Sequence, residues 1–452
     1  MGLNCRQHHD FMLPLVPIVQ AIGLRGLPID LVRRQEMLST LAARIGTLDI
    51  TLSSQGLTAP SSTRKTGIQL RELGVPLTEM TPKKTQYKLD AEIIGKINWL
   101  YNIRPGGTPK FPFLHTLLLR ARLAKAYENI SGLVVCNDGL LRTSLKACNT
   151  RTSRYASSGF GRKNKPGFCP VCLEWGQHGT NLQNITRGCA VCGSPPADCT
   201  CKDGGVHIKS LFTSWPTWKL GELDYAALEL RIMAYRIRCD KLIGRLERGD
   251  DLHTLHAQIM FPGLPITKRR RVLAKNLIYA IRGAGGARAV KIELAKKGEY
   301  VEESEIENWR LLIFAEYPEI PAWIAEVDEM LARQTANKER RVIRNAFGRP
   351  RVLLGYQPLK EALADEISST AAYIMNFVLR RGMYKAPRVF NRICMQFHDA
   401  FGVHAPKDEF DSVMGSLKEE MERPVWHWDQ FVKYPVECKA GGQWSDLKPW
   451  AS

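Results

Sequence analysis

Two stretches of the sequence place acidic side chains where a rigidly held carboxylate would bind a metal ion. In the first, the segment Leu220–Leu223 is interpreted as a short strand that delivers Asp224 to a turn before a helix. In the second, short apolar runs flank His398 and Asp399, which predicts a hairpin with this pair at its turn. A carboxylate at the end of a buried strand is usually there to bind something. Alternatively, Asp224 caps the helix and the second pair only forms the turn.

A third stretch, residues 267–279, combines cations with an aromatic ring. Arg271, Lys275 and Tyr279 recur every four residues, so a helix would present them on one face. Apolar residues are expected to fill the other side: Val272, Leu273, Leu277 and Ile278. A triphosphate needs cations near its leaving group, because negative charge builds there during phosphoryl transfer. The alternative is a basic amphipathic helix with a solvated face.

Two Cys-x-x-Cys pairs predict a structural zinc site. The pairs are Cys169 with Cys172 and Cys189 with Cys192. Together they supply four thiolates, which suit tetrahedral Zn²⁺ and leave no open position for catalysis. Further candidate ligands follow or lie between the pairs: His178, Cys199, Cys201 and His207. Free thiols, or disulfides in an oxidised protein, are the alternatives.

Composition and charge narrow the class of protein. The chain has 452 residues with 44% hydrophobic residues, enough for about two to four folded domains. Lys and Arg number 64 against 45 Asp and Glu, and the net charge of +19 predicts a polyanionic partner such as nucleic acid. We expect no membrane span, because no apolar run approaches about 20 residues. The N-terminus lacks the pattern of a signal peptide, so the 12 cysteines are expected to be reduced, some of them on metal.

The first acidic stretch resembles the first catalytic motif of family A DNA polymerases. The matching pattern is Asp224-Tyr-x-x-x-Glu229-Leu-Arg231. The resemblance implies that Asp224 binds two Mg²⁺ ions and that Glu229 limits access at the sugar 2′ position. It also implies that Arg231 supports the site and is one of the residues that bind DNA. Ala227 departs from the family, which often has Gln there.

The second acidic stretch resembles the family's last motif, Gln-x-His-Asp. By this resemblance Asp399 is the second metal ligand, while His398 and Gln396 lie near the primer end. Ala400 replaces an acid that the family usually carries. The sequence His-Asp-Ala-Phe-Gly also resembles single-subunit RNA polymerases, which stay an alternative.

The basic helix resembles the family's fingers helix, Arg-x-x-x-Lys-x-x-x-Phe/Tyr. The resemblance implies that Arg271 and Lys275 bind phosphates, that Lys275 also protonates the pyrophosphate, and that Tyr279 packs on the nucleotide. His253, in an Asp-x-His pattern, would contact the incoming triphosphate, although alone it reads equally as a surface residue of a helix. The family's Tyr-Gly is missing from residues 280–286.

Two further segments resemble parts of the family that bind DNA. Arg154, followed by Tyr-Ala-Ser-Ser, would contact the minor groove at the primer end. Asn181, Gln183 and Asn184 match a segment on the DNA-binding face. The Cys-rich insertion, residues 166–204, is foreign to the common family pattern, and we expect it to support the primer–template groove or to touch DNA.

The resemblance implies an α+β fold with right-hand polymerase architecture: a palm with an antiparallel sheet, helical fingers and thumb, and a small zinc-ribbon-like insertion. We expect an N-terminal segment and thumb at residues 1–135, the first part of the palm at 136–240 with the insertion at 166–204, fingers at 241–335, and the second part of the palm at 336–452.

Local patterns predict further elements. The sequence predicts an extended segment at residues 13–17, a helix whose apolar face includes Met37, Leu38, Leu41, Ile45 and Leu48, helices at 91–101, 112–130 and 358–381, and a strand and turn at 341–349.

The implied function is template-directed addition of dNTPs to a primer 3′-hydroxyl by two-metal phosphoryl transfer. We expect primer–template DNA and dNTPs as partners, Mg²⁺ and structural Zn²⁺ as cofactors, and a monomer. We expect it in the cytoplasm of a bacterial or phage-infected cell, with an organelle as an open alternative. No 3′–5′ proofreading is expected unless a partner chain supplies it; a processivity partner is also open. The alternatives are an RNA polymerase, a non-catalytic DNA-binding relative and a zinc-dependent binding module.

Overall fold

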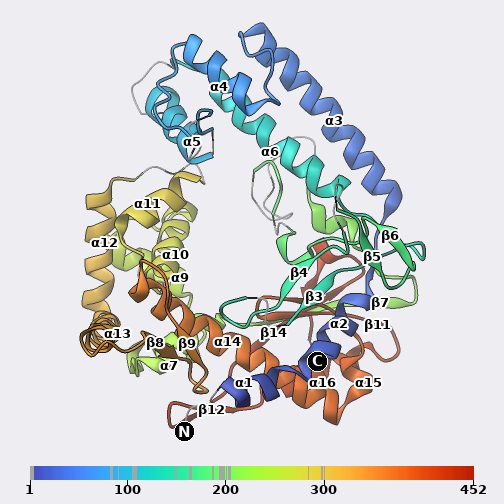
Figure 1. The fold of residues 1–452 in the computed structure, drawn as a ribbon, viewed down its shortest axis with the longest axis vertical. Coiled ribbons are helices and arrows are strands. Elements are labelled where there is room, and N and C mark those ends of the chain that lie inside the picture. Colours follow the sequence, from blue (N-terminus) through green and yellow to red (C-terminus); the bar gives the residue numbers. More distant parts are fainter. Residues whose placement is uncertain are drawn as a thin grey trace.

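A five-stranded antiparallel sheet joins parts of the chain that are far apart in sequence (Figure 1). The computed structural model describes residues 5–81, 85–89, 91–103, 109–147, 150–161, 165–185, 188–192, 199, 201, 205–282, 285–296, 299 and 301–451. The strand order is β10-β11-β7-β14-β15. The strands are β7 (Trp218–Tyr225), β10 (Ile393–Phe397), β11 (Ala400–Pro406), β14 (Val436–Gly441) and β15 (Lys448–Pro449).

The central strand β7 packs one face on the helix α16 (Phe410–Met421). The hydroxyl of Tyr225 donates to the carbonyl of Met421 across 2.6 Å. Gly221 lies on the same face, and a Cβ there would come within 2.5 Å of the Met414 Sδ atom. Glycine in this strand therefore lets the helix approach the backbone closely.

Helices cover the sheet and extend away from it. The remaining α-helices are α1 (Cys5–Met12), α2 (Leu15–Arg25), α3 (Leu31–Ser54), α4 (Thr63–Glu72), α5 (Ala91–Asn98), α6 (Phe113–Ser131), α7 (Leu228–Arg236), α8 (Asp240–Glu247), α9 (Leu252–Met260), α10 (Lys268–Arg282), α11 (Ala287–Lys296), α12 (Glu303–Glu316), α13 (Glu319–Ala336), α14 (Pro358–Lys385) and α15 (Pro387–Phe390). None of the helices in the described ranges is both long and apolar enough to cross a membrane.

Short antiparallel pairs and single turns complete the described structure. The pairs are β1 (Leu27–Pro28) with β2 (Leu140–Leu141), β3 (Ser144–Lys146) with β4 (Ala156–Ser158), β5 (Gly167–Cys169) with β6 (Glu174–Gly176), β8 (Val342–Arg344) with β9 (Pro350–Val352), and β12 (Val425–His427) with β13 (Gln430–Val432). The turns are the π-helix η1 (Trp99–Ile103) and the 3-10 helices η2 (Leu182–Asn184), η4 (Ile208–Leu211) and η5 (Trp444–Asp446).

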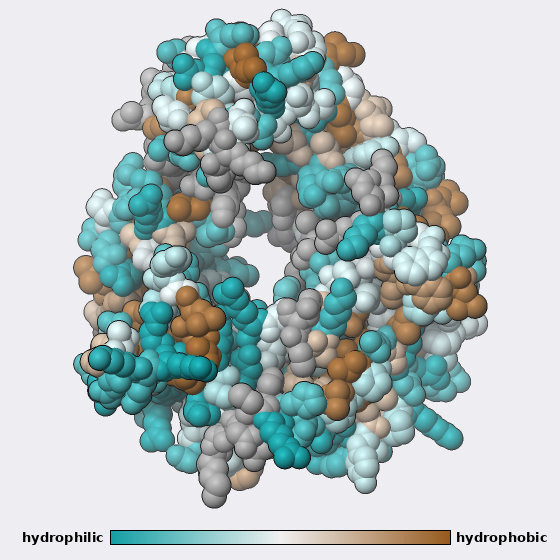
Figure 2. Space-filling view, viewed as in Figure 1, coloured by the Kyte–Doolittle hydropathy of each residue, from teal (hydrophilic) through white to brown (hydrophobic). Residues whose placement is uncertain are grey.

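The elements surround a central opening. Figure 1 shows α3–α6 at the top, α9–α13 on the left, and the five-stranded sheet with α2, α14 and α16 below. Helix α5 contacts α11, so the upper and left groups meet. In the same view, Figure 2 shows an opening that passes between these groups.

The first described helices belong structurally with the end of the chain. Helix α2 packs on β3, β10 and α14. The guanidinium of Arg25 donates to the carbonyl of Ile393 across 2.5 Å and to the Asn391 side chain across 2.6 Å. The N-terminal segment therefore braces the hairpin that carries the second acidic residue.

Most predicted elements are confirmed, and one is wrong. The predicted helices correspond to α3, α5 with η1, α6 and α14, and the strand and turn correspond to β8 and the turn that follows it. Residues 13–17 are not extended: residues 13 and 14 form a turn, and residues 15–17 begin α2. Pro17 lies in the first turn of α2, where a backbone N–H has no helical partner and proline is tolerated.

Candidate active site

The two predicted acidic residues meet at one edge of the five-stranded sheet. Strands β7 and β11 pair so that Asp224 faces Ala400, the residue after Asp399. The backbone N–H of Tyr225 donates to the carbonyl of Asp399 across 3.3 Å. The N-cap of α7 is Ala227, with φ of 54°, so Asp224 ends the strand and does not cap the helix. The register thus brings two distant carboxylate residues to neighbouring positions.

The Asp399 carboxyl lies in a half-buried environment with other acids nearby. Burial raises the pKa of Asp399 and the Glu229 carboxylate raises it further; a backbone hydrogen bond and Arg154 oppose this shift only in part. On β14, the exposed Glu437 also faces Asp224. Such a group of carboxylate oxygens, with like charges close together, is suited to a hard divalent cation such as Mg²⁺.

A chain of hydrogen bonds connects the hairpin turn to the segment around η2. The buried Gln396 side chain donates to the carbonyl of His398 across 2.9 Å. The Gln183 amide lies 3.3 Å from the Gln396 side-chain oxygen. Asn181 caps η2 by accepting from the backbone N–H of Gln183. The Asn184 side chain lies outside the described part of the structure.

Glu229 is held from two sides above the same sheet edge. Its carboxylate accepts a hydrogen bond from the Ser368 hydroxyl on α14 at 2.8 Å and forms an ion pair with Arg154. Two segments far apart in sequence therefore fix this one side chain. A carboxylate held in this way has a defined position for excluding a neighbouring group.

Arg231 supports the structure from inside and does not face the opening. Its side chain is buried, and its guanidinium donates to the carbonyls of Ala226 at 2.9 Å and Leu246 at 2.7 Å. This geometry fits the supporting part of its expected role. Direct contact between Arg231 and DNA, which its place in the DNA-binding group implied, does not fit a guanidinium buried on backbone carbonyls.

Helix α10 presents the predicted cationic face. Arg271, Lys275 and Tyr279 are all exposed, and the Lys275 ammonium lies 5.9 Å from the centre of the Tyr279 ring. Leu273, Leu277 and Ile278 are buried as expected. The exception is Val272, which is 41% exposed.

Helix α9 places two more polar residues against this face. Arg271 pairs with Asp251, the N-cap of α9, at 2.8 Å. Burial raises the pKa of Asp251, but hydrogen bonds from Arg271 and Thr254 outweigh it and lower that pKa to about 2. Burial lowers the pKa of His253, and the nearby Lys275 lowers it further, so its imidazole is neutral near pH 7. A phosphate bound by Arg271 would compete with Asp251.

The predicted set of four zinc ligands does not come together, and the structure divides it. Cys169 and Cys172 gather with Cys136 and His178. The other pair gathers with two later cysteines, which gives the set Cys189, Cys192, Cys199 and Cys201. Each Cys-x-x-Cys turn supplies two of the four ligands of a zinc ion, so the two pairs together suggested one shared site. The spacing does not reveal which other residues complete the coordination of each pair. His207 belongs to neither set.

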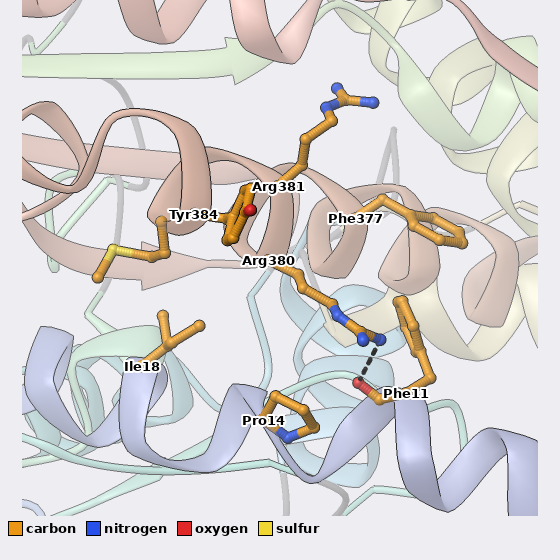
Figure 3. A pocket seen from close by; sticks show the side chains of 8 residues that line it. Phe11, Pro14, Ile18, Phe377, Arg380, Arg381 and Tyr384 are labelled. Carbon is orange, nitrogen blue, oxygen red and sulfur yellow. Dashed lines mark hydrogen bonds between the residues drawn. The ribbon is translucent and has the colours of Figure 1, made fainter.

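An apolar pocket lies elsewhere, between α1, α2 and α14. Figure 3 shows its lining, in which Arg380 donates to the carbonyl of Phe11 at 3.5 Å. Its volume is about 610 Å³, and its walls are mainly apolar. None of its lining residues is among the predicted site residues.

Two residues of these sites, Ser368 and Cys136, were not predicted from the sequence. Ser368 contacts Glu229, but a single Ser carries no local signal. Asp251 belongs to the Asp-x-His pattern around His253, but its contact with Arg271 was not predicted. Cys136 stands alone in the sequence, outside any Cys-x-x-Cys pair. The only signal for a further ligand was that each pair supplies just two of the four ligands of a zinc ion.

Comparison with known proteins gives consistent results. Residues 176–446 match the profile described as DNA polymerase family A. DNA polymerase I of Chloroflexus aurantiacus is 23% identical, over 97% of this chain and 43% of that protein. Thermostable DNA polymerase I of Thermus aquaticus is 22% identical, over 96% of this chain and 48% of that protein. The chain thus spans less than half the length of these relatives.

A solved structure has a similar fold. The POL domain of Pol1 from M. smegmatis, in complex with DNA primer-template and dNTP, superposes with a TM-score of 0.69. The two are 21% identical, and the match covers 93% of this chain and 68% of that one.

Proposed function

The chain belongs to DNA polymerase family A, and from this we propose that it adds dNTPs to a primer 3′-hydroxyl along a DNA template. The observation that carries the proposal is the pairing of β7 with β11, which sets Asp224 beside Asp399. An exposed cationic helix face, with Arg271 and Lys275, supplies the second requirement of phosphoryl transfer.

We propose that Asp224 and Asp399 hold two Mg²⁺ ions. When bound, the ions supply Lewis-acid activation of the primer hydroxyl and stabilise charge on the leaving group. The donor set fits these ions, because carboxylate oxygens are the ligands that Mg²⁺ prefers. The pKa of Asp399 is raised by burial first and by the nearby Glu229 carboxylate second. The backbone of both residues is held by strand pairing, since Asp224 lies in β7 and Asp399 directly precedes β11.

The roles proposed for the helical side chains follow from their charge. Arg271 and Lys275 bind the triphosphate, and Lys275 donates a proton to the departing pyrophosphate. His253, neutral beside them, contacts a phosphate oxygen, and its Nδ1 atom is buried without a hydrogen-bond partner among the described residues. Tyr279 packs on the nucleotide.

We propose that α3–α6 form the thumb, α8–α13 the fingers, and the sheet with α14 and α16 the palm. Because α2 packs on palm elements, we assign it to the palm as well. Primer–template DNA would occupy the opening, near Arg154, Asn181, Gln183, Asn184, Gln396 and His398. With a net charge of +19, binding should weaken steeply as salt increases.

Glu229→Ala tests the proposed exclusion of ribonucleotides. The carboxylate is fixed by Ser368 and Arg154, so we expect its removal to open space at the sugar 2′ position. Discrimination between dNTP and NTP, measured as the ratio of kcat/KM values, should fall by about 10–10²-fold. Glu419→Ala, at an exposed position on α16, is the control. An unchanged ratio in Glu229→Ala would remove this role.

The Mg²⁺ requirement should depend on pH. Because the pKa of Asp399 is raised, its carboxyl takes up a proton at a higher pH than an ordinary Asp, and the proton competes with the metal ion. We expect the Mg²⁺ concentration for half-maximal extension to rise as pH falls from 8 to about 5.5. Glu229→Gln removes a neighbouring charge and should shift this rise to lower pH. A Mg²⁺ midpoint independent of pH would contradict the assignment.

Primer extension by the purified chain is the direct test. With a primed DNA template, Mg²⁺ and dNTPs, we expect the primer to lengthen in template order, as a monomer and without added factors. Extension with NTPs but not dNTPs would favour the RNA polymerase alternative. DNA binding without extension would favour a non-catalytic relative. The relatives are bacterial, so we propose that the chain acts in a bacterial or phage-infected cell.

A further inference from the structure

The two cysteine clusters are compact enough for a single ion each. The first cluster is Cys136, Cys169, Cys172 and His178, and the second is Cys189, Cys192, Cys199 and Cys201. Within each cluster, one ligand atom from every residue lies within 4.8 Å of all the others. Figure 1 shows β5 and β6, which flank the first pair, near the lower end of α6.

The distances between ligand atoms match tetrahedral coordination and do not match disulfides. In the first cluster, Cys136 and Cys169 Sγ atoms lie 3.7 Å apart, and the Cys172 Sγ and His178 Nδ1 atoms also lie 3.7 Å apart. In the second, the sulfur pairs are 3.8 and 3.6 Å apart. Four sulfurs about 2.3 Å from a shared Zn²⁺ would be about 3.8 Å from one another. A disulfide would need about 2.05 Å.

Backbone N–H groups point at the sulfur atoms, as the ligands of a metal ion require. Val191 and Val206 each donate to Cys189 Sγ at 3.3 Å. In the first cluster, Asn137 donates to Cys172 Sγ at 3.4 Å. Such donors stabilise the negative charge of a thiolate, which is the form that binds metal.

A glycine closes the second cluster. Gly205 has φ of +67°, and a Cβ on it would lie 2.6 Å from Cys199 Sγ and 2.8 Å from Cys189 Sγ. Both the backbone conformation and the space around the sulfurs therefore require glycine at this position.

We infer that the chain binds two structural Zn²⁺ ions, one in each cluster. Thiolate and imidazole ligands select zinc over Mg²⁺. Four protein ligands complete the tetrahedral coordination of each ion, so its role is to fix the backbone and not to activate water.

The two ions would fix both ends of a segment that reaches the catalytic hairpin. His178 and Cys189 bound residues 179–188, which carry η2. From this segment Gln183 contacts Gln396, whose side chain bonds to the His398 carbonyl. This positioning role rests on the proposed function, whereas zinc binding does not.

Zinc content per chain tests the inference without reference to synthesis. We expect two zinc ions per purified, reduced chain by mass spectrometry of the metal, one in Cys136→Ser, one in Cys199→Ser, and none in the double variant. Gly205→Ala should lose the second ion while all eight ligands remain. Cys239→Ser, at a buried cysteine outside both clusters, is the control and should keep two.

Cobalt loading tests the two sites in the wild-type chain, so its result does not depend on whether the cysteine variants fold. The wild-type chain loaded with Co²⁺ should show thiolate-to-cobalt absorption that saturates at two equivalents, and His178→Cys should keep two ions with stronger absorption. Saturation at one equivalent, or two zinc ions in Cys136→Ser, would overturn the assignment.

The positioning role has its own readout. Primer–template affinity, measured without Mg²⁺ or dNTPs, should fall about tenfold in Cys136→Ser and less than twofold in Cys239→Ser. Loss of one zinc ion with unchanged affinity would overturn the positioning role and leave the two zinc sites in place.

Discussion

Asp399→Asn is expected to reduce primer extension by at least about 10³-fold while primer–template affinity stays within about threefold of wild type. The amide has almost the same shape as the carboxylate, so the hairpin turn and the bond between Tyr225 and the Asp399 carbonyl should survive. What is lost is the negative charge beside Asp224. Single-turnover extension and equilibrium DNA binding, measured at the same salt concentration, separate these two effects.

The matched control is Asp408→Asn, which lies beyond the far end of β11 and is exposed. This variant removes one negative charge, as Asp399→Asn does, but just beyond the hairpin, and it should leave primer extension unchanged. If Asp399→Asn retained more than a tenth of wild-type activity, the two-carboxylate site would be wrong even though the family membership would stand.

Lys275→Ala is expected to lower the rate of nucleotide addition by about 10²–10³-fold. The ammonium is exposed on α10 next to Tyr279. The nearby His253 and Arg271 do not occupy the same position, so neither can replace Lys275 as the proton donor. Rapid-quench kinetics at saturating dNTP measures the chemical step, and the dNTP dependence gives the loss in binding.

Two variants separate proton donation by Lys275 from simple attraction. Lys275→Arg keeps the positive charge but cannot lose a proton, so it should restore dNTP binding without restoring the rate. Arg269→Ala removes a cation from another side of the same helix, where it pairs with Glu299, and should change neither. Full rescue of the rate by Lys275→Arg would show that Lys275 acts through charge alone.

Local elements could be predicted from the sequence because their signals are local. The short segment that forms β7 and the four-residue recurrence on α10 each depend on neighbouring residues, and both elements are confirmed. The convergence of Asp224 and Asp399 depends on strand register between distant segments, which no local pattern encodes. Only the resemblance to a known family predicted it.

The cysteine prediction was wrong for the same physical reason. A Cys-x-x-Cys turn fixes the distance between its own two sulfurs but not the identity of the remaining ligands. Cys136 comes from the connection after α6, and Cys199 and Cys201 come from the chain after the second pair. The division into two clusters is decided by tertiary packing, and the spacing of the cysteines carries no information about that packing.

The packing of α2 against β10 has a consequence for the order of folding. On a ribosome, α2 emerges more than 350 residues before β10, which Arg25 anchors. Contacts of such high sequence separation form slowly, because a long loop must close before they are made. The nascent chain must therefore keep the apolar face of α2, with Leu15, Val19 and Ile22, from aggregating until β10 has been synthesised.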